Sequence, residues 1–139
     1  MSSPLLVTGF RDKIFAIDRA TGEVRWRVQL TNSGYTGCVE LAIDDTLIVA
    51  CTPVDLAFID YTTGTIRNQV SRLDKTRGDR AIMVLDGGNV FIGSRGAVAC
   101  YSGDGELLWE QGFKGEGYGD VALGFPHNVR QADKSGSHT

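Results

Sequence analysis

With 139 residues, the chain is long enough for one domain with its own core, and its 42% hydrophobic and 22% charged residues exclude a disordered protein. Its formal net charge of -3 removes any overall electrostatic reason to expect nucleic acid as a partner. No apolar run reaches the ~18 residues that a membrane span needs, and residues 1–7 lack the features of a signal peptide. We therefore expect a cytoplasmic globular protein with no membrane partner.

The chain opens with short apolar segments that are typical of β-strands. Leu5–Phe10 predicts one strand, and Lys13–Asp18 predicts a second strand that is covered on both faces, because it contains few polar residues. Residues 23–30 alternate strictly between apolar and polar side chains, which is the pattern of a half-exposed edge strand.

The turn between the last two of these strands has a specific chemistry. Asp18 can accept backbone N–H groups, Thr21 can add a hydroxyl bond, and Gly22 supplies the positive φ that closes the turn. Trp26 follows on the edge strand. We therefore predict a tight strand–turn–strand unit that ends near Trp26.

This unit recurs twice. The second copy carries Asp60, Thr63 and Gly64, and the third carries Gly105 and Trp109. The three turn glycines are 42 and 41 residues apart, a period typical of β-propeller blades. The sequence therefore predicts a repeat of blade size.

Between the copies, the sequence predicts two further strands for each unit, at residues 38–43 and 46–51 and again at residues 81–85 and 89–93. A complete unit is then four short antiparallel strands, ordered from the inside of a blade to its outside. Residues 120–125 resemble the innermost strand once more, whereas the first unit has no innermost strand before it. The chain therefore holds three circularly permuted blades.

These repeats resemble the PQQ-like β-propeller family, that of quinoprotein alcohol dehydrogenases, whose blades carry the motif Ala-x-Asp-x-x-Thr-Gly-x-x-x-Trp. The first copy matches it throughout, the second has Asn68 in place of Trp, and the third departs by one residue in the turn. The resemblance implies an all-β propeller in which the Trp docks between neighbouring blades. It also implies structural roles for Asp18, Thr21, Gly22, Trp26, Asp60, Thr63, Gly64, Gly105 and Trp109.

The quinoprotein enzymes of that family hold their cofactor with a calcium site and often with a disulfide between adjacent cysteines. Here no two cysteines are adjacent, and no acidic cluster has the spacing of a calcium loop. We therefore predict no cofactor and no metal, and we expect the cysteines to be small buried hydrophobic residues.

Three blades cannot close a propeller, because such rings need at least about four. Two chains of three blades each, related by a twofold axis, would make one six-bladed ring. In that ring, residues 120–125 would pair with Leu5–Phe10 of the other chain and complete its first blade. We predict such a homodimer with an exchanged strand, built from a propeller unit at residues 1–128 and followed by a flexible polar tail at residues 129–139.

One loop face of the predicted blades gathers most of the basic residues, and residues 72–80 form its longest loop. Such a face can attract an anionic or peptide partner, although a solvated mixed-charge rim explains the same residues. The predicted partner-binding residues are Tyr35, Arg72, Arg77, Arg80, Arg95 and Tyr118.

No catalytic motif accompanies these residues, and we assign no catalytic residue. The sequence therefore favours a non-enzymatic interaction module or scaffold that binds a protein, peptide or small anionic ligand on its basic face. Two alternatives stay open. The chain could be half of a PQQ-like propeller enzyme with an active site at the channel mouth, or a fragment of a longer propeller.

Overall fold

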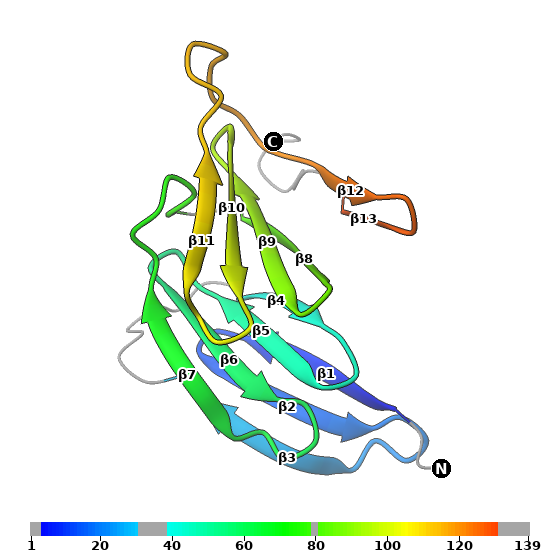
Figure 1. The fold of residues 1–139 in the computed structure, drawn as a ribbon. Helices are drawn as coiled ribbons and strands as arrows, with labels where there is room; N and C mark the ends of the chain where they lie inside the picture. The colour runs from blue at the N-terminus through cyan, green and yellow to red at the C-terminus, as the bar shows by residue number, and fades with distance from the viewer. Residues whose placement is uncertain (1–3, 31–38, 79–80, 131–139) are drawn as a thin grey trace, which may run out of the picture.

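The computed structural model describes residues 4–30, 39–78 and 81–130, and the strands in these ranges form antiparallel sheets. Blade 1 is a three-stranded sheet, and blades 2 and 3 are four-stranded sheets, each in chain order (Figure 1). The strands of blade 1 are β1 (Leu5–Phe10), β2 (Lys13–Asp18) and β3 (Val24–Gln29). Those of blade 2 are β4 (Glu40–Ile43), β5 (Leu47–Cys51), β6 (Asp55–Asp60) and β7 (Ile66–Ser71). Those of blade 3 are β8 (Ile82–Asp86), β9 (Asn89–Ser94), β10 (Ala97–Ser102) and β11 (Leu107–Gln111).

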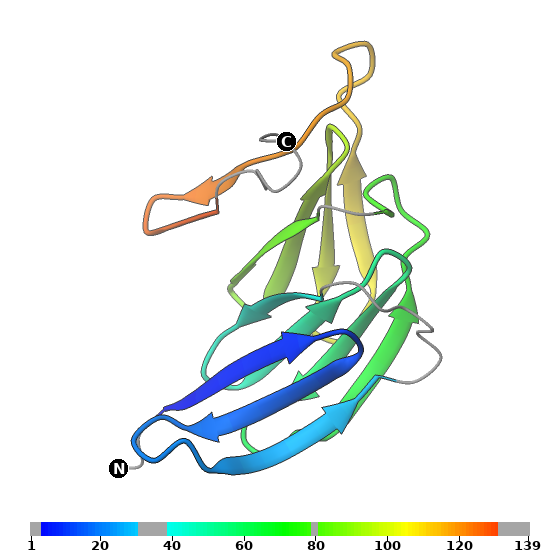
Figure 2. The same cartoon turned by 180° about the vertical axis from the view of Figure 1, so that it is seen from behind.

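The three blades stack face to face, as the blades of a propeller do. The outer strands β3, β7 and β11 lie on one side of the stack, while the inner strands β4 and β8 contact each other on the other side (Figure 1). Blade 1 lies at one end, and in Figure 2, where it faces the viewer, no described strand covers its outer face. The predicted number and order of strands in these blades are confirmed.

Two hydrophobic cores hold the stack together. Between blades 1 and 2 lies a cluster that includes Ile14, Ile48 and Ile59, all 0% exposed. Between blades 2 and 3 lies a larger cluster that includes Phe58 and Ile92, also 0% exposed. Because both faces of blade 2 are covered, all five residues of β5 are buried, which explains why its sequence shows no polar alternation.

A short hairpin follows blade 3. It consists of β12 (Leu123–Phe125) and β13 (Asn128–Arg130), and both strands contact β8. The strand predicted at residues 120–125 begins only at Leu123. Before Leu123 the chain runs over blade 3, with the Val121 side chain against Gly93. Strand β13 also extends two residues beyond the predicted end of the propeller unit at residue 128.

No helix in the described ranges is long and apolar enough to cross a lipid bilayer. The predicted binding residues Tyr35 and Arg80 lie outside the described residues, as does Cys38. Cys51 and Cys100 are free and buried, as expected for small hydrophobic residues.

Candidate functional site

The candidate site lies where the connection from β7 to β8 meets the turns β5–β6 and β9–β10. These three segments line one open hollow of about 420 Å³. Its lining residues are Pro53, Val54, Asp74, Lys75, Arg77, Gly78 and Arg95. The sequence prediction that these loops share one face is therefore confirmed.

Arg72 fixes the base of this hollow from inside the protein. Its guanidinium donates hydrogen bonds to the backbone carbonyl oxygens of Thr52 (2.7 Å), Gly78 (3.1 Å) and Thr76. Buried carbonyl oxygens need donors, and a planar guanidinium with five N–H groups can supply several at once. This side chain thus fastens the connection from β7 to β8 to the β5–β6 turn, together with backbone hydrogen bonds from Arg72 N to Val54 O (2.7 Å) and from Gly78 N to Pro53 O (3.0 Å).

The predicted role of Arg72 in partner binding is wrong. Its side chain is 0% exposed, and its two terminal nitrogens donate to these loop carbonyl groups, so it cannot reach a ligand at the surface. The sequence showed an arginine in a long charged loop, but it could not show that the loop folds back around that arginine.

A second buried group supports the same loop. The Asp74 carboxylate accepts hydrogen bonds from the hydroxyl groups of Thr76 and, at 3.1 Å, Tyr101. Burial and the charge of Asp74 raise the pKa of Tyr101, which therefore stays a neutral donor. Burial likewise raises the pKa of Cys51 to about 12, so its thiol is not a nucleophile at neutral pH.

Three exposed cations surround the hollow. Lys75 and Arg77 extend from the β7–β8 connection, and Arg95 extends from the β9–β10 turn, where its side chain passes beside Gly78. Within the described ranges none of the three makes an ion pair, and Asp74 is the only carboxylate in the lining. The Glu110 carboxylate also lies beside Lys75 and accepts from its backbone N–H at 2.9 Å. The three cations outnumber the carboxylates around the hollow, and this balance of charge favours an anionic group.

A second open hollow of about 620 Å³ adjoins the first and shares Arg77 with it. Leu73 also lines it, and this side chain is 83% exposed. Sequence reasoning missed Leu73 and left Lys75 out of the site. The sequence did contain a signal for Leu73, because a single leucine between charged residues in a loop can be an exposed contact residue. Together the two adjoining hollows are lined by three cations, the carboxylates of Asp55 and Asp74, and the exposed side chain of Leu73.

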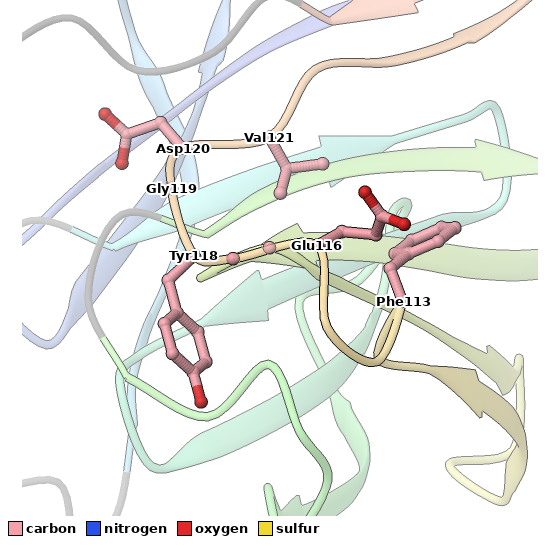
Figure 3. A pocket seen from close by; sticks show the side chains of 8 residues that line it. Phe113, Glu116, Tyr118, Gly119, Asp120 and Val121 are labelled. Atoms are coloured by element: carbon pink, nitrogen blue, oxygen red, sulfur yellow. The ribbon is translucent and has the colours of Figure 1, made fainter.

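Tyr118 lies on the same face, in a pocket beside Gly96 whose lining includes none of these three cations. It belongs to the connection from β11 to β12, which is fastened to the β9–β10 turn by a hydrogen bond of 2.8 Å from Gly96 N to Gly119 O. A shallow pocket of about 290 Å³ lies here, and the ring of Tyr118 points away from Phe113 and Val121 (Figure 3). Tyr118 is 91% exposed, so it is accessible to a partner.

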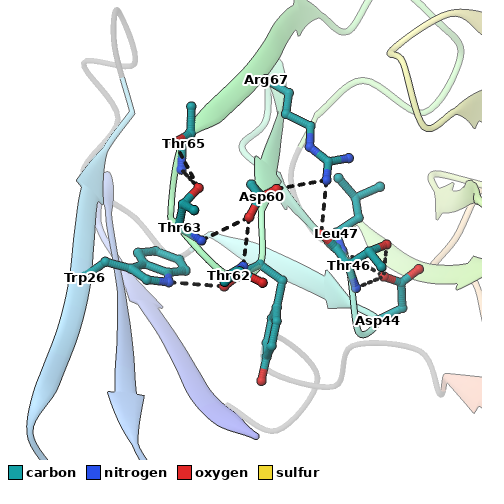
Figure 4. A network of polar contacts seen from close by, with 10 residues as sticks. Trp26, Asp44, Thr46, Leu47, Asp60, Thr62, Thr63, Thr65 and Arg67 are labelled. Atoms are coloured by element: carbon teal, nitrogen blue, oxygen red, sulfur yellow. Dashed lines mark hydrogen bonds and ion pairs between the residues drawn. The ribbon is translucent and has the colours of Figure 1, made fainter. Parts of the chain in front are cut away.

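The repeated turns are built as their chemistry predicted. The Asp60 carboxylate accepts the backbone N–H groups of Thr62 (2.9 Å) and Thr63 (3.0 Å), and it pairs with Arg67 at 3.1 Å (Figure 4). The Asp18 carboxylate does the same with Ala20 and Thr21. The pKa values of both carboxyl groups are lowered, chiefly by the backbone hydrogen bonds from Thr63 to Asp60 and from Ala20 to Asp18.

Trp26 joins two blades, as its resemblance to the propeller motif implied. Its Nε1 donates to the backbone oxygen of Tyr61 at 3.1 Å, across the gap between blades 1 and 2 (Figure 4). A Cβ atom on Gly64 would lie 2.5 Å from the Trp26 ring, so only glycine fits below it. Trp109, by contrast, is 48% exposed and contacts Phe91 of its own blade.

Among the described residues, no group of three or more His, Cys, Asp and Glu side chains has a metal-binding arrangement. His127 lies 3.3 Å from Asp86 in an exposed pair near the β12–β13 hairpin. Neither residue belongs to the hollows described above.

The repeated blades, their turn chemistry and the Trp contact define a PQQ-like β-propeller fold. Solved structures share it. BamB from Moraxella catarrhalis has a TM-score of 0.59 and 23% identity, over 78% of this chain and 33% of that one. The quinohemoprotein alcohol dehydrogenase from Comamonas testosteroni has a TM-score of 0.58 and 17% identity, over 77% and 19% of the two chains. A protein of unknown function from Bacteroides caccae has a TM-score of 0.54 and 22% identity, over 78% and 40%.

This chain thus spans two fifths or less of the length of these three structures. No family model matches the chain, and no curated protein matches it. At these identities the likeness establishes the fold alone.

Proposed function

We propose that this chain is a non-enzymatic β-propeller interaction module that binds an acidic segment of a partner protein on its basic loop face. The observation that carries the proposal is the set of unpaired cations, Lys75, Arg77 and Arg95, around one hollow. A carboxylate-rich segment would gain charge-assisted hydrogen bonds there without breaking existing ion pairs of the described residues.

The shape of the surface favours an extended segment over a small enclosed ligand. Two open hollows adjoin through Arg77, and Leu73 adds an exposed apolar contact beside the cations. Small-molecule sites are usually enclosed and mostly apolar, whereas extended peptides use rows of contacts along a surface. Cys51 and Tyr101 lie below this surface, and burial raises the pKa of both groups, so neither supplies a nucleophile there at neutral pH.

The proposal is tested with a labelled oligo-glutamate peptide and fluorescence anisotropy. The double variant Arg77→Glu/Arg95→Glu should weaken binding by about tenfold or more, since each exposed charge contact contributes modestly and reversal adds repulsion. Arg19→Glu is the matched control, because Arg19 is exposed in the β2–β3 turn, away from the hollows. An equal loss in both variants, or no binding by the unaltered chain, would reject the basic face as the site.

We further infer that the functional unit is a six-bladed ring made from two chains. In it, β12 of one chain takes the place of the inner strand that blade 1 of the other lacks. Here β12 pairs with β13 of its own chain through three residue pairs, whereas β1 pairs with β2 through six. The exchange therefore requires β13 to separate from β12. Because only three residue pairs join these two strands, their separation breaks few backbone hydrogen bonds.

A further inference from the structure

The described blades are joined by a repeated inter-blade contact, in which an outer strand meets a turn glycine of the next blade. In the first instance, Trp26 of β3 covers Gly64 in the β6–β7 turn of blade 2, with ring atoms 2.5 Å from the site of a Cβ. Its Nε1 donates to the carbonyl oxygen of Tyr61 in that same turn.

The second instance joins blade 2 to blade 3 in the same direction. Asn68 of β7 covers Gly105 in the β10–β11 turn, with Nδ2 2.7 Å from the site of a Cβ. That Nδ2 donates to the carbonyl oxygen of Asp104 at 2.7 Å. Both instances therefore combine a side-chain N–H donor, a turn carbonyl and a glycine that leaves room for the donor.

The two ends of the stack carry the two separate halves of a third such contact. Trp109 occupies the outer strand β11 and is 48% exposed, with no described turn covering it. Gly22 occupies the β2–β3 turn with φ +79°, and no described atom lies within 4 Å of the site of its Cβ. Each half thus lacks its complement within the described part of one chain.

The turn around Gly22 is already shaped like the turn that receives Trp26. Gly22 N donates to the backbone oxygen of Asp18 at 2.8 Å, as Gly64 N donates to that of Asp60 at 2.9 Å. φ is +79° at Gly22 and +77° at Gly64. By this equivalence the carbonyl of Arg19 corresponds to the carbonyl of Tyr61, which accepts from Trp26.

Apolar side chains are exposed on the sheets behind both halves. The register pairs Leu6 with Ile17 in blade 1 as it pairs Ile48 with Ile59 in blade 2. Leu6 is nevertheless 58% exposed, whereas Ile48 is 0% exposed because blade 1 covers it. At the other end, Trp109 on the outer strand β11 of blade 3 is 48% exposed. Exposed apolar side chains at opposite ends of one stack are the arrangement that a closed ring would bury.

We propose that Trp109 of each chain docks over Gly22 of a second copy, with its Nε1 donating to the carbonyl oxygen of Arg19 of the partner subunit. This inference rests on the proposed two-chain ring and names the contact that closes it. A second copy supplies both missing halves, since one end of the described blades carries Trp109 and the other end carries the open turn of Gly22. A twofold axis then forms the contact twice and continues the blade–blade interface that the chain already uses internally.

The first test measures dimerisation by sedimentation equilibrium with Gly22→Ala and its control Gly87→Ala. Both glycines have positive φ, +79° and +60°, and both have open space around a new Cβ, so the two variants carry comparable backbone strain. Gly22→Ala should weaken the dimer by about 100-fold, because the clash with Trp109 would occur twice in the ring. Gly87→Ala should leave the dimer constant within about threefold of the unaltered chain.

The second test replaces Trp109 by Ala, with Phe113→Ala as its control, since both side chains are 48% exposed. Trp109→Ala should also weaken the dimer by about 100-fold, and Phe113→Ala should not weaken it. Equal dimer constants for Gly22→Ala and Gly87→Ala, or for Trp109→Ala and Phe113→Ala, would overturn the proposed contact.

A third measurement separates failure of the contact from failure of the ring. In the unaltered chain labelled with 5-fluorotryptophan, the ¹⁹F resonance of Trp109, assigned with Trp109→Phe, should shift as concentration drives dimerisation, while that of Trp26 should stay. A dimer without a shift at Trp109 would overturn the contact and leave the ring standing. A monomer at every concentration would overturn both.

Discussion

The two blade junctions use the same contact with side chains of different size. At the first, the Trp26 ring covers Gly64, and Tyr61 adds a hydrogen bond from its hydroxyl to the backbone oxygen of Leu5 at 3.0 Å. At the second, the smaller Asn68 reaches across by a single hydrogen bond. The second junction has the larger buried core and the buried Arg72, Asp74 and Tyr101 beside it.

The difference indicates which interactions stabilise each junction. Where the core between two blades is small, a large aromatic side chain at its edge extends the buried apolar surface. Where the core is large and a polar network fastens the connecting loop, an amide is enough to meet the next turn. The glycine and the carbonyl are common to both junctions, whereas the donor side chain can change.

The largest expected effect concerns the polar network of the second junction. Arg72→Ala should lower the free energy of unfolding by about 3 kcal/mol or more, because buried carbonyl oxygens of Thr52, Thr76 and Gly78 would lose their donor. Arg77→Ala, in the same loop but exposed, should change it by only about 0.5 kcal/mol. Urea unfolding followed by circular dichroism measures both. Similar losses in the two variants would contradict the structural role of Arg72.

The next effect concerns the glycine of the first junction. Gly64→Ala should cost about 2–4 kcal/mol, because the new Cβ would lie 2.5 Å from the Trp26 ring at a φ of +77°. Gly87→Ala has a similar backbone strain but open space, and it should cost only about 1 kcal/mol. Urea unfolding measures the free energy of unfolding of both variants. Equal costs would mean that backbone strain alone, and not the Trp26 contact, requires glycine at position 64.

The smallest effect concerns acid stability. Hydrogen bonds lower the folded-state pKa of Asp18 and Asp60, so their contribution to stability is complete above the ordinary carboxyl pKa of about 3.9 and is lost as pH falls through the lower folded values. The equivalent turn of blade 3 uses the Ser102 hydroxyl, which accepts from Glu106 N at 3.1 Å and does not titrate there.

Replacing Asp60 by Asn should therefore reduce the loss of stability between about pH 4 and pH 2. Ser102→Ala should lower stability by a similar amount at every pH in that range. Unfolding by urea at a series of pH values measures both variants. An unchanged pH dependence in Asp60→Asn would show that its carboxylate is not linked to folding.

Much of the fold could be predicted from the sequence because its information is local and repeated. Asp18, Gly22 and Trp26 make one turn that the chain copies, and alternation of apolar residues marks the strands around it. Sequence also indicated the candidate face, since the order of strands fixes which loops lie together. Arg77 and Arg95 do meet there.

The rest depended on long-range packing that local patterns do not contain. Arg72 looked like its neighbours Arg77 and Lys75, and only the folded loop shows that it is buried. Leu73 was overlooked because the local pattern does not show whether a leucine in a loop is buried or exposed. Strand β13 followed a proline and a histidine, and its pairing with β12 depends on where the hairpin lies against β8.

The central claim is that the described blades are an open stack which a second copy completes. Sedimentation equilibrium of the unaltered chain tests it most directly, over concentrations from below one micromolar to several hundred micromolar. The account predicts a reversible transition from the 15.0 kDa of one chain to twice that mass, with no larger species. A constant mass of 15.0 kDa throughout, or growth to open-ended polymers, would contradict it.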